Sequence, residues 1–127
     1  VTDSKESKLA CFCNSPAIPH TLSNLTSEII GTFILVLGVG AIFADELAAG
    51  FGPFLVGALV WGIGLSLGGP TGYAINPARD FAPRLAHAIL PIPGKGDSGF
   101  GYSWIPVVGP LIGGLLAGLF MLLFPVF

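Results

Sequence analysis

The sequence predicts an all-α membrane protein with three transmembrane helices and one re-entrant half-helix. Hydrophobic residues make up 53% of the 127-residue chain and charged residues only 9%, whereas soluble domains carry roughly 25% charged residues. Three long apolar runs are separated by polar or turn-rich sequence. A shorter stretch of helical composition lies between the second and third runs and is too brief to cross a bilayer.

Residues 1–21 are predicted to form a polar loop or tail without a core of its own, because they are polar and contain Pro16 and Pro19. The chain starts at Val1 without the basic region and apolar core of a signal peptide, so we expect the sequence to begin within a longer protein. The remaining residues, 22–127, are expected to form one membrane domain.

The expected spans of this domain cover about residues 22–44, 47–67 and 104–127, and the re-entrant loop with its half-helix covers about 68–90. About 20 helical residues, at a rise of about 1.5 Å each, cross a hydrocarbon core about 30 Å thick, so each long run can span. The connection at Asp45 and Glu46 is short enough to make the first two helices antiparallel. The half-helix is roughly 20 Å long and reaches about halfway across.

Glycine is unusually frequent, with 19 residues in the chain. Several glycines recur at four-residue spacing, which lets helices approach closely in a membrane. We therefore predict tight helix packing at most of the following positions: Gly64 with Gly68, Gly109 with Gly113, and Gly114 with Gly118.

The start of the half-helix is marked by Asn76, a favoured N-cap, and Pro77, which suits the first helical position. A glycine-rich approach, residues 68–72, precedes it. Irregular backbone at membrane depth is tolerated only where it is buried in protein or lines a watery cavity. The segment is therefore a pore candidate, in which the positive end of the helix dipole would attract solute oxygens and repel cations, protons included.

Two side chains are expected to donate hydrogen bonds into the lumen. Asn76 can cap the helix with its oxygen and still present two N–H donors. Arg79 lies three residues later on the same face, and its permanent charge is tolerable in a membrane only beside water or a partner. The alternative for Arg79 is a structural arginine that is paired internally.

The other charges near this segment are interpreted as structural. Asp80 and Arg84 have the favourable acid-first i, i+4 spacing, so we expect them to pair and brace the half-helix. Glu28 is the only charge inside a span. It could relay protons in a transporter, or it could accept hydrogen bonds from backbone N–H groups of the re-entrant loop. We favour the second role, because such a loop leaves amides that need acceptors.

Nucleic-acid and metal sites are not expected. The formal net charge is -2, and no basic stripe is present to neutralise phosphates. Cys11 and Cys13 are too close for an easy disulfide and too few for a closed zinc site, so we expect free thiols. His20 and His87 lie in no cluster with metal-ligand spacing and are expected at the surface.

One segment, residues 72–84, closely resembles the second signature loop of the major intrinsic protein (aquaporin) family; its sequence is GYAINPARDFAPR. The better match is the glycerol branch, the aquaglyceroporins, because of Asp80, Arg84 and the pair Pro110-Leu111 in the last span. In that family Asn-Pro-Ala occurs twice, at the tips of two half-helices that meet from opposite sides, whereas this chain contains one copy. The resemblance covers almost the whole chain and implies the C-terminal, aquaporin-like half of an inverted repeat.

The resemblance also implies roles for single residues. Arg79 is similar to the constriction arginine, Tyr73 to its aromatic partner, and Gly64 to the small residue that replaces a histidine of water channels and widens the ring. The backbone carbonyls of Gly72, Tyr73 and Ala74 would form a ladder of acceptors. Structural support would come from Glu28, Pro77, Ala78, Asp80 and Arg84.

The function implied by the resemblance is passive permeation of glycerol and similar small uncharged solutes, with water, while ions and protons are excluded. No chemical step is involved, so neither enzyme activity nor a cofactor is expected. Implied partners are glycerol, water, small polyols, the lipid bilayer, a missing N-terminal half with the first Asn-Pro-Ala-like loop, and further copies in a homotetramer of the plasma (inner) membrane. Alternatives are a water-selective aquaporin, half of a secondary transporter that couples through Glu28, and a membrane protein that does not conduct.

Overall fold

The structure is a computed structural model that describes residues 4–44 and 46–124. These residues form helices and contain no strand, which confirms the predicted all-α fold. In chain order the helices are α1 (Lys5–Ala10), α2 (Thr21–Ile42), α3 (Phe51–Leu67), α4 (Pro77–Ile89), α5 (Phe100–Ser103) and α6 (Ile105–Leu123).

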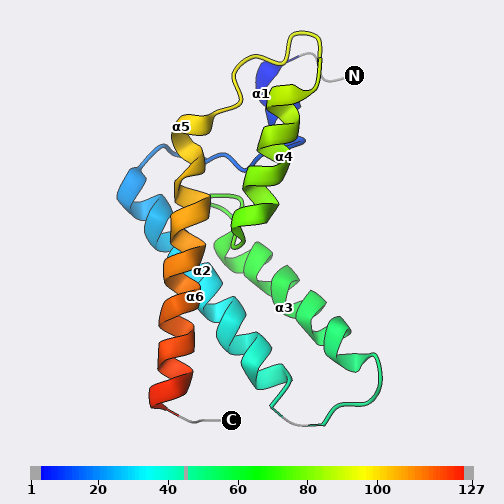
Figure 1. Cartoon of the computed structure of the whole chain (residues 1–127), viewed down its shortest axis with the longest axis vertical. Coiled ribbons are helices and arrows are strands. Elements are labelled where there is room, and N and C mark those ends of the chain that lie inside the picture. The colour runs from blue at the N-terminus through cyan, green and yellow to red at the C-terminus, as the bar shows by residue number, and fades with distance from the viewer. Residues whose placement is uncertain (1–3, 45, 125–127) are drawn as a thin grey trace.

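The helix α4 begins near the middle of the molecule. Figure 1 shows α3 in the lower half and α4 in the upper half, joined near mid-height by the loop 68–76. The helix α6 packs mainly against α2, and α4 contacts α6. The helices α2 and α3 are in contact and run in opposite directions, as the sequence predicted. The irregular loop before α4 therefore lies inside the helix bundle and not at one of its ends.

Within the part of the chain that the structure describes, two helical stretches are long and apolar enough to cross a membrane: α2, with 22 residues, and Phe100–Leu123, with 24 residues. The helix α3 has only 17 residues, which gives about 25 Å against a hydrocarbon core of about 30 Å. The predicted span 47–67 is therefore too long at its start. Apolar composition extends the run to Leu47, but Gly50 has a left-handed φ of 80° and turns the chain immediately before Phe51.

The connections around these helices also differ from the prediction. Residues 43–50 join α2 to α3, so the linker is longer than the acidic pair alone; Asp45 itself lies outside the described residues. The last helical stretch begins at Phe100, before the predicted start at 104, because α5 leads directly into α6. Residues 125–127 of that predicted span lie outside the described residues.

The polar start of the chain is not the plain loop that the sequence predicted. Residues Lys5–Ala10 form α1, which is capped by the side chain of Ser4, a favoured N-cap residue. Lys8 Nζ donates to the Pro93 carbonyl at 2.9 Å, so α1 is tied to the connection that follows α4. The helix α1 thus lies beside the upper end of α4 (Figure 1).

The close approach of α2 and α6 depends on glycine. A Cβ added at Gly109 would lie 2.6 Å from Glu28 Cβ, and one added at Gly113 would collide with the carbonyl of Ile29. Tight packing is therefore confirmed for this pair of glycines. A Cβ added at Gly118 meets nothing within 4 Å in the described part of the chain, so the prediction of tight packing is wrong for that position there.

Candidate functional site

The candidate site is built on the loop 68–76 between α3 and α4. Its residues Gly72, Tyr73 and Ile75 have positive φ values of 78°, 43° and 45°. Such backbone is uncommon for non-glycine residues and unfavourable for a β-branched one, so the surrounding structure must hold the loop. Because the loop forms neither helix nor strand, its N–H and C=O groups need partners from elsewhere.

Glu28 of α2 supplies two of these partners. The N–H of Ala74 donates to Glu28 Oε1 at 3.0 Å, and the N–H of Ile75 donates to Oε2 at 2.7 Å. The carboxylate is buried, with the residue 1% exposed. Both oxygens are thus occupied by the loop, which is the arrangement expected of a supporting carboxylate; that role stays a prediction.

Asn76 caps α4. Its side-chain oxygen accepts hydrogen bonds from the backbone N–H groups of Ala78, at 2.9 Å, and Arg79, at 3.3 Å. Pro77 occupies the start of the helix, where its missing N–H costs nothing. Asn76 is exposed, and its Nδ2 donates to no side chain or carbonyl among the described residues. Two N–H donors therefore remain for water or a solute.

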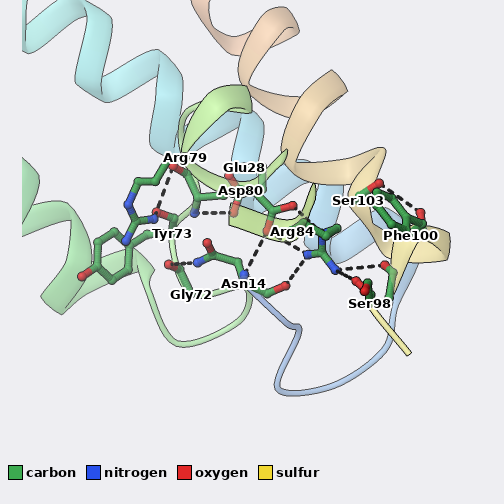
Figure 2. A network of polar contacts seen from close by, with 12 residues as sticks. Asn14, Glu28, Gly72, Tyr73, Arg79, Asp80, Arg84, Ser98, Phe100 and Ser103 are labelled. Atoms are coloured by element: carbon green, nitrogen blue, oxygen red, sulfur yellow. Dashed lines mark hydrogen bonds and ion pairs between the residues drawn. The ribbon is translucent and has the colours of Figure 1, made fainter. Parts of the chain in front are cut away.

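Arg79 is exposed and contacts Tyr73 in two ways. Its Nη1 donates to the Tyr73 carbonyl at 2.6 Å and to the Ala74 carbonyl at 3.5 Å. Its guanidinium carbon lies 4.7 Å from the centroid of the Tyr73 ring, within cation–π range, and Figure 2 shows the two side chains together. Within the described residues no carboxylate pairs with Arg79, so several of its N–H groups stay available.

The Tyr73 ring lies over Gly64 of α3 and over Gly68, the residue that follows this helix. A Cβ added at Gly64 would lie 3.0 Å from Tyr73 Cζ, and one added at Gly68 would lie 2.6 Å from Tyr73 Cδ1. A larger residue at either position would have to displace the ring. The aromatic ring thus takes up the space that a side chain at position 64 would fill, and the expectation that Gly64 widens the passage stays a prediction.

Asp80 and Arg84 form the ion pair that their spacing predicted. Arg84 Nη2 and Nε donate to the two Asp80 oxygens, both at 2.8 Å, and the side chains are 1% and 0% exposed. The same guanidinium donates to the carbonyls of Ser98, at 2.8 Å, Gly99, at 3.0 Å, and Asn14, at 2.8 Å. The pair therefore connects α4 to two segments outside it, and the contacts of Arg84 with Asn14 and Ser98 are drawn in Figure 2.

Asn14 belongs to this network although no sequence signal indicated it. Its backbone N–H donates to Asp80 Oδ1 at 2.9 Å, and its Nδ2 donates to the Gly72 carbonyl at 2.5 Å. These partners are 66 and 58 positions away in the sequence. Local spacing therefore carries no information about the contacts, and only a relation between distant segments could have revealed them.

The upper end of α4 is covered. His87 is fully buried, its Nδ1 lies 2.8 Å from Ser98 Oγ, and its ring lies edge-on to Phe12 with centroids 5.4 Å apart. The prediction of a surface histidine is wrong for His87, because the segment before α2 packs over it. His20 is exposed and caps α2. Lys95 Nζ donates to three backbone carbonyls at the end of α4.

The cysteines near this end are free thiols. Cys11 is exposed and Cys13 is buried. Burial raises the pKa of the Cys13 thiol above its usual value, so the thiol stays protonated over a wider pH range. Within residues 4–44 and 46–124, no group of three or more His, Cys, Asp or Glu side chains could hold a metal ion.

An open cavity of about 540 Å³ lies beside the approach to the loop and not at Arg79. It is lined by Ala17, Ile18, His20, Ser23, Asn24, Gly69 and Pro70. Asn76 and Arg79 instead lie on an exposed face of the chain. A closed passage past these two residues therefore requires a second wall.

Known proteins resemble the chain over nearly its whole length. Residues 1–121 match the family model described as "Major intrinsic protein". The chain is 65% identical over 115 residues to the probable glycerol uptake facilitator protein of Thermotoga maritima, an alignment that covers 91% of this chain and 49% of that protein. It is 58% identical over 119 residues to the glycerol uptake facilitator protein of Bacillus subtilis, with 94% and 43% covered, and 60% identical over 116 residues to that of Streptococcus pneumoniae, with 91% and 50% covered. The chain thus spans about half the length of these curated relatives.

Proposed function

Since this chain belongs to the major intrinsic protein family, a family of integral membrane channels and transporters, we propose that it is the C-terminal half of a channel for glycerol and similar small uncharged solutes. The observation that carries the proposal is the contact of Arg79 with Tyr73, whose ring lies over Gly64, beside the Asn-Pro-Ala start of α4. Relatives named as glycerol uptake facilitators, at 58% to 65% identity, support the choice of solute.

The donors and acceptors of the site suit the hydroxyl groups of a polyol. Arg79 and Asn76 present N–H groups that no described residue uses. The carbonyls of Gly72 and Tyr73 each accept one hydrogen bond from a side chain. A carbonyl oxygen has two lone pairs, so each can accept a second hydrogen bond from a solute. The Tyr73 ring offers an apolar surface to the carbon edge of the same molecule.

Ions would be excluded for two reasons. A few neutral donors and acceptors cannot replace the hydration of an ion, and burying an unpaired charge costs several kcal/mol or more. The guanidinium of Arg79 and the N-terminus of α4 add positive potential where a cation or proton would have to pass. Permeation would thus be passive and selective without a chemical step or a cofactor.

The assembly that we propose has two halves. An N-terminal half with its own Asn-Pro-Ala-like loop would face Asn76 and Arg79 and supply the second wall. The term "assembled channel" denotes this chain joined to, or produced together with, such an N-terminal half. The whole protein would cross the plasma (inner) membrane several times and associate as a homotetramer.

The alternatives have weaker support. A transporter that relays protons through Glu28 needs a carboxylate free to exchange protons, whereas both oxygens of Glu28 accept hydrogen bonds from the loop. For a protein that does not conduct, replacing Arg79 by alanine should leave permeability unchanged, whereas the channel predicts altered selectivity.

Flux measurements on the assembled channel in liposomes would test the proposal. We expect glycerol flux that rises linearly with concentration and does not depend on pH or sodium, with no conductance for ions. Saturable flux driven by a proton or sodium gradient would contradict it in favour of a transporter. Water flux without glycerol flux would contradict it in favour of a water-selective channel.

A further inference from the structure

Asn14 is held on both sides of its peptide backbone by the buried ion pair of α4. Its N–H donates to Asp80 Oδ1 at 2.9 Å, and its carbonyl accepts from Arg84 Nη2 at 2.8 Å. Asp80 and Arg84 are 0% and 1% exposed and bind each other bidentately. The backbone position of Asn14 is therefore fixed by charged groups that have little freedom of their own.

The side chain of Asn14 reaches from this fixed backbone to the candidate site. Its Nδ2 donates to the Gly72 carbonyl at 2.5 Å, and Figure 2 shows it between Gly72 and the Asp80–Arg84 pair. A Cβ added at Gly72 would lie 2.7 Å from Asn14 Nδ2, so the two residues are in direct contact.

The orientation of the Gly72 carbonyl also affects the neighbouring residue, Tyr73. The Gly72 carbonyl and the Tyr73 N–H belong to one planar peptide unit, so they can only turn together. That unit joins two residues with positive φ, Gly72 at 78° and Tyr73 at 43°, and has few alternative states without strain. Turning it changes the φ of Tyr73, the torsion angle that orients the Tyr73 ring and carbonyl, which are the two groups in contact with Arg79.

We propose that Asn14 is a positioning residue for solute selection, which fixes the peptide between Gly72 and Tyr73 and so sets the geometry of the Tyr73–Arg79 contact. The proposal rests on the proposed channel function. It also gives Asp80 and Arg84 a purpose beyond bracing α4, since they hold the residue that orients the loop. Glu28 holds the next two amides of the same loop from α2, so the loop is fixed from both sides.

Two substitutions in the assembled channel test this role. Asn14→Ala removes the donor, and Asn14→Asp keeps the shape but places an acceptor against the Gly72 carbonyl. The matched control is Lys8→Ala, which breaks a different hydrogen bond between the start of the chain and the α4–α5 connection. The readouts are the ratio of glycerol to erythritol permeability in liposomes, the amount of protein in the membrane, and its thermal unfolding temperature.

We expect the permeability ratio to change by about threefold to tenfold in Asn14→Ala, the effect of one lost hydrogen bond, and further in Asn14→Asp. In Lys8→Ala the ratio should match that of the unchanged channel. An unchanged permeability ratio in both Asn14 variants would overturn the proposal. Equal changes of this ratio in the Asn14 and Lys8 variants would also overturn it, because they would indicate a general loosening of the start of the chain. If one Asn14 variant does not fold, the permeability ratio of the other variant tests the proposal. Absence of glycerol flux in the unchanged channel would instead overturn the proposed function itself.

Discussion

At the scale of single residues, Arg79 combines a permanent positive charge with exposure. Its side-chain Nη1 donates hydrogen bonds to the carbonyls of Tyr73 and Ala74, and no carboxylate among the described residues pairs with it. An unpaired charge on a face that would line a passage affects every ion that approaches it. A neighbouring cation at a few Å is repelled by about 2–4 kcal/mol at an effective dielectric constant of about 20.

We predict that Arg79→Ala increases proton and cation leak through the assembled channel by at least about tenfold, given a repulsion of that size. Glycerol flux should persist, because Asn76 and the loop carbonyls remain. The measurement is dissipation of a pH gradient in liposomes, followed with a fluorescent dye. Lys5→Ala, which removes one positive charge from α1, serves as the control and should leave the leak unchanged. Equal leak in both variants would contradict a role for Arg79 in the passage.

Glu28 gives a second prediction at this scale. Glu28→Gln keeps the size of the side chain but replaces one oxygen, which accepts from the N–H of Ala74 or Ile75, by a donor. One buried loop amide then loses its acceptor, which costs about 1–3 kcal/mol. The unfolding temperature should fall, and the remaining flux should stay independent of pH. Unchanged stability together with loss of a proton-coupled flux would instead show that Glu28 relays protons.

Single residues differ in how far the sequence could predict them. The contacts of Glu28, Asp80 and Arg84 followed from local rules, because an intramembrane charge needs a partner and i, i+4 neighbours meet on a helix. The burial of His87 and the contacts of Asn14 depend on segments that are distant in sequence. No local pattern contains that information.

At the scale of helices, local sequence also fails to predict some of the helix ends. Apolar composition located α2, α3 and α6, since a membrane helix needs a long apolar run. Composition could not place the start of α3, because the apolar run continues without a break from Leu47 through Gly50 into the helix. The boundary is set by the left-handed φ of Gly50, immediately before Phe51. By contrast, the start of α4 was predictable at Asn76 and Pro77, where capping chemistry is specific to residue type.

The contact between α2 and α6 yields a prediction about glycine. Gly113→Ala should destabilise the protein by roughly 1–3 kcal/mol, because the new methyl group collides with the Ile29 carbonyl and backbone cannot move aside cheaply. Gly118→Ala is the matched control in the same helix, since an added Cβ there meets nothing within 4 Å of the described chain. It should be neutral or stabilising, as alanine favours helix over glycine by about 1 kcal/mol. Thermal unfolding in detergent compares the two, and similar stability in both variants would contradict close packing of α2 and α6 at Gly113.

At the scale of the whole molecule, the distribution of polarity is the reverse of that in a soluble domain. Among the described residues, the six largest fully buried side chains include five that are polar or charged, Arg84, His87, Glu28, Thr71 and Asp80; the sixth is Pro106. Several large apolar side chains of α3 and α6 are more than two-thirds exposed, among them Trp61, Leu65, Leu115 and Leu122. Exposed apolar surface of this extent needs lipid or another protein surface to cover it. The inside of the chain is thus held by hydrogen bonds, and its outside suits a membrane environment.

The exposed donors make the last prediction one about assembly. Asn76 and Arg79 lie on an open face, so in the proposed channel this chain would provide one wall of the passage and would leave polar groups facing lipid if no second wall met them. We therefore expect liposomes with this chain alone to show glycerol flux no higher than empty liposomes, and flux to appear when the N-terminal half of the Bacillus subtilis relative is produced with it. The Arg79→Ala variant of the same pair identifies the route, because only flux past residue 79 changes its selectivity. Glycerol flux through this chain alone, altered by Arg79→Ala, would mean that two copies of this half face each other, since the passage would then have formed without any other wall.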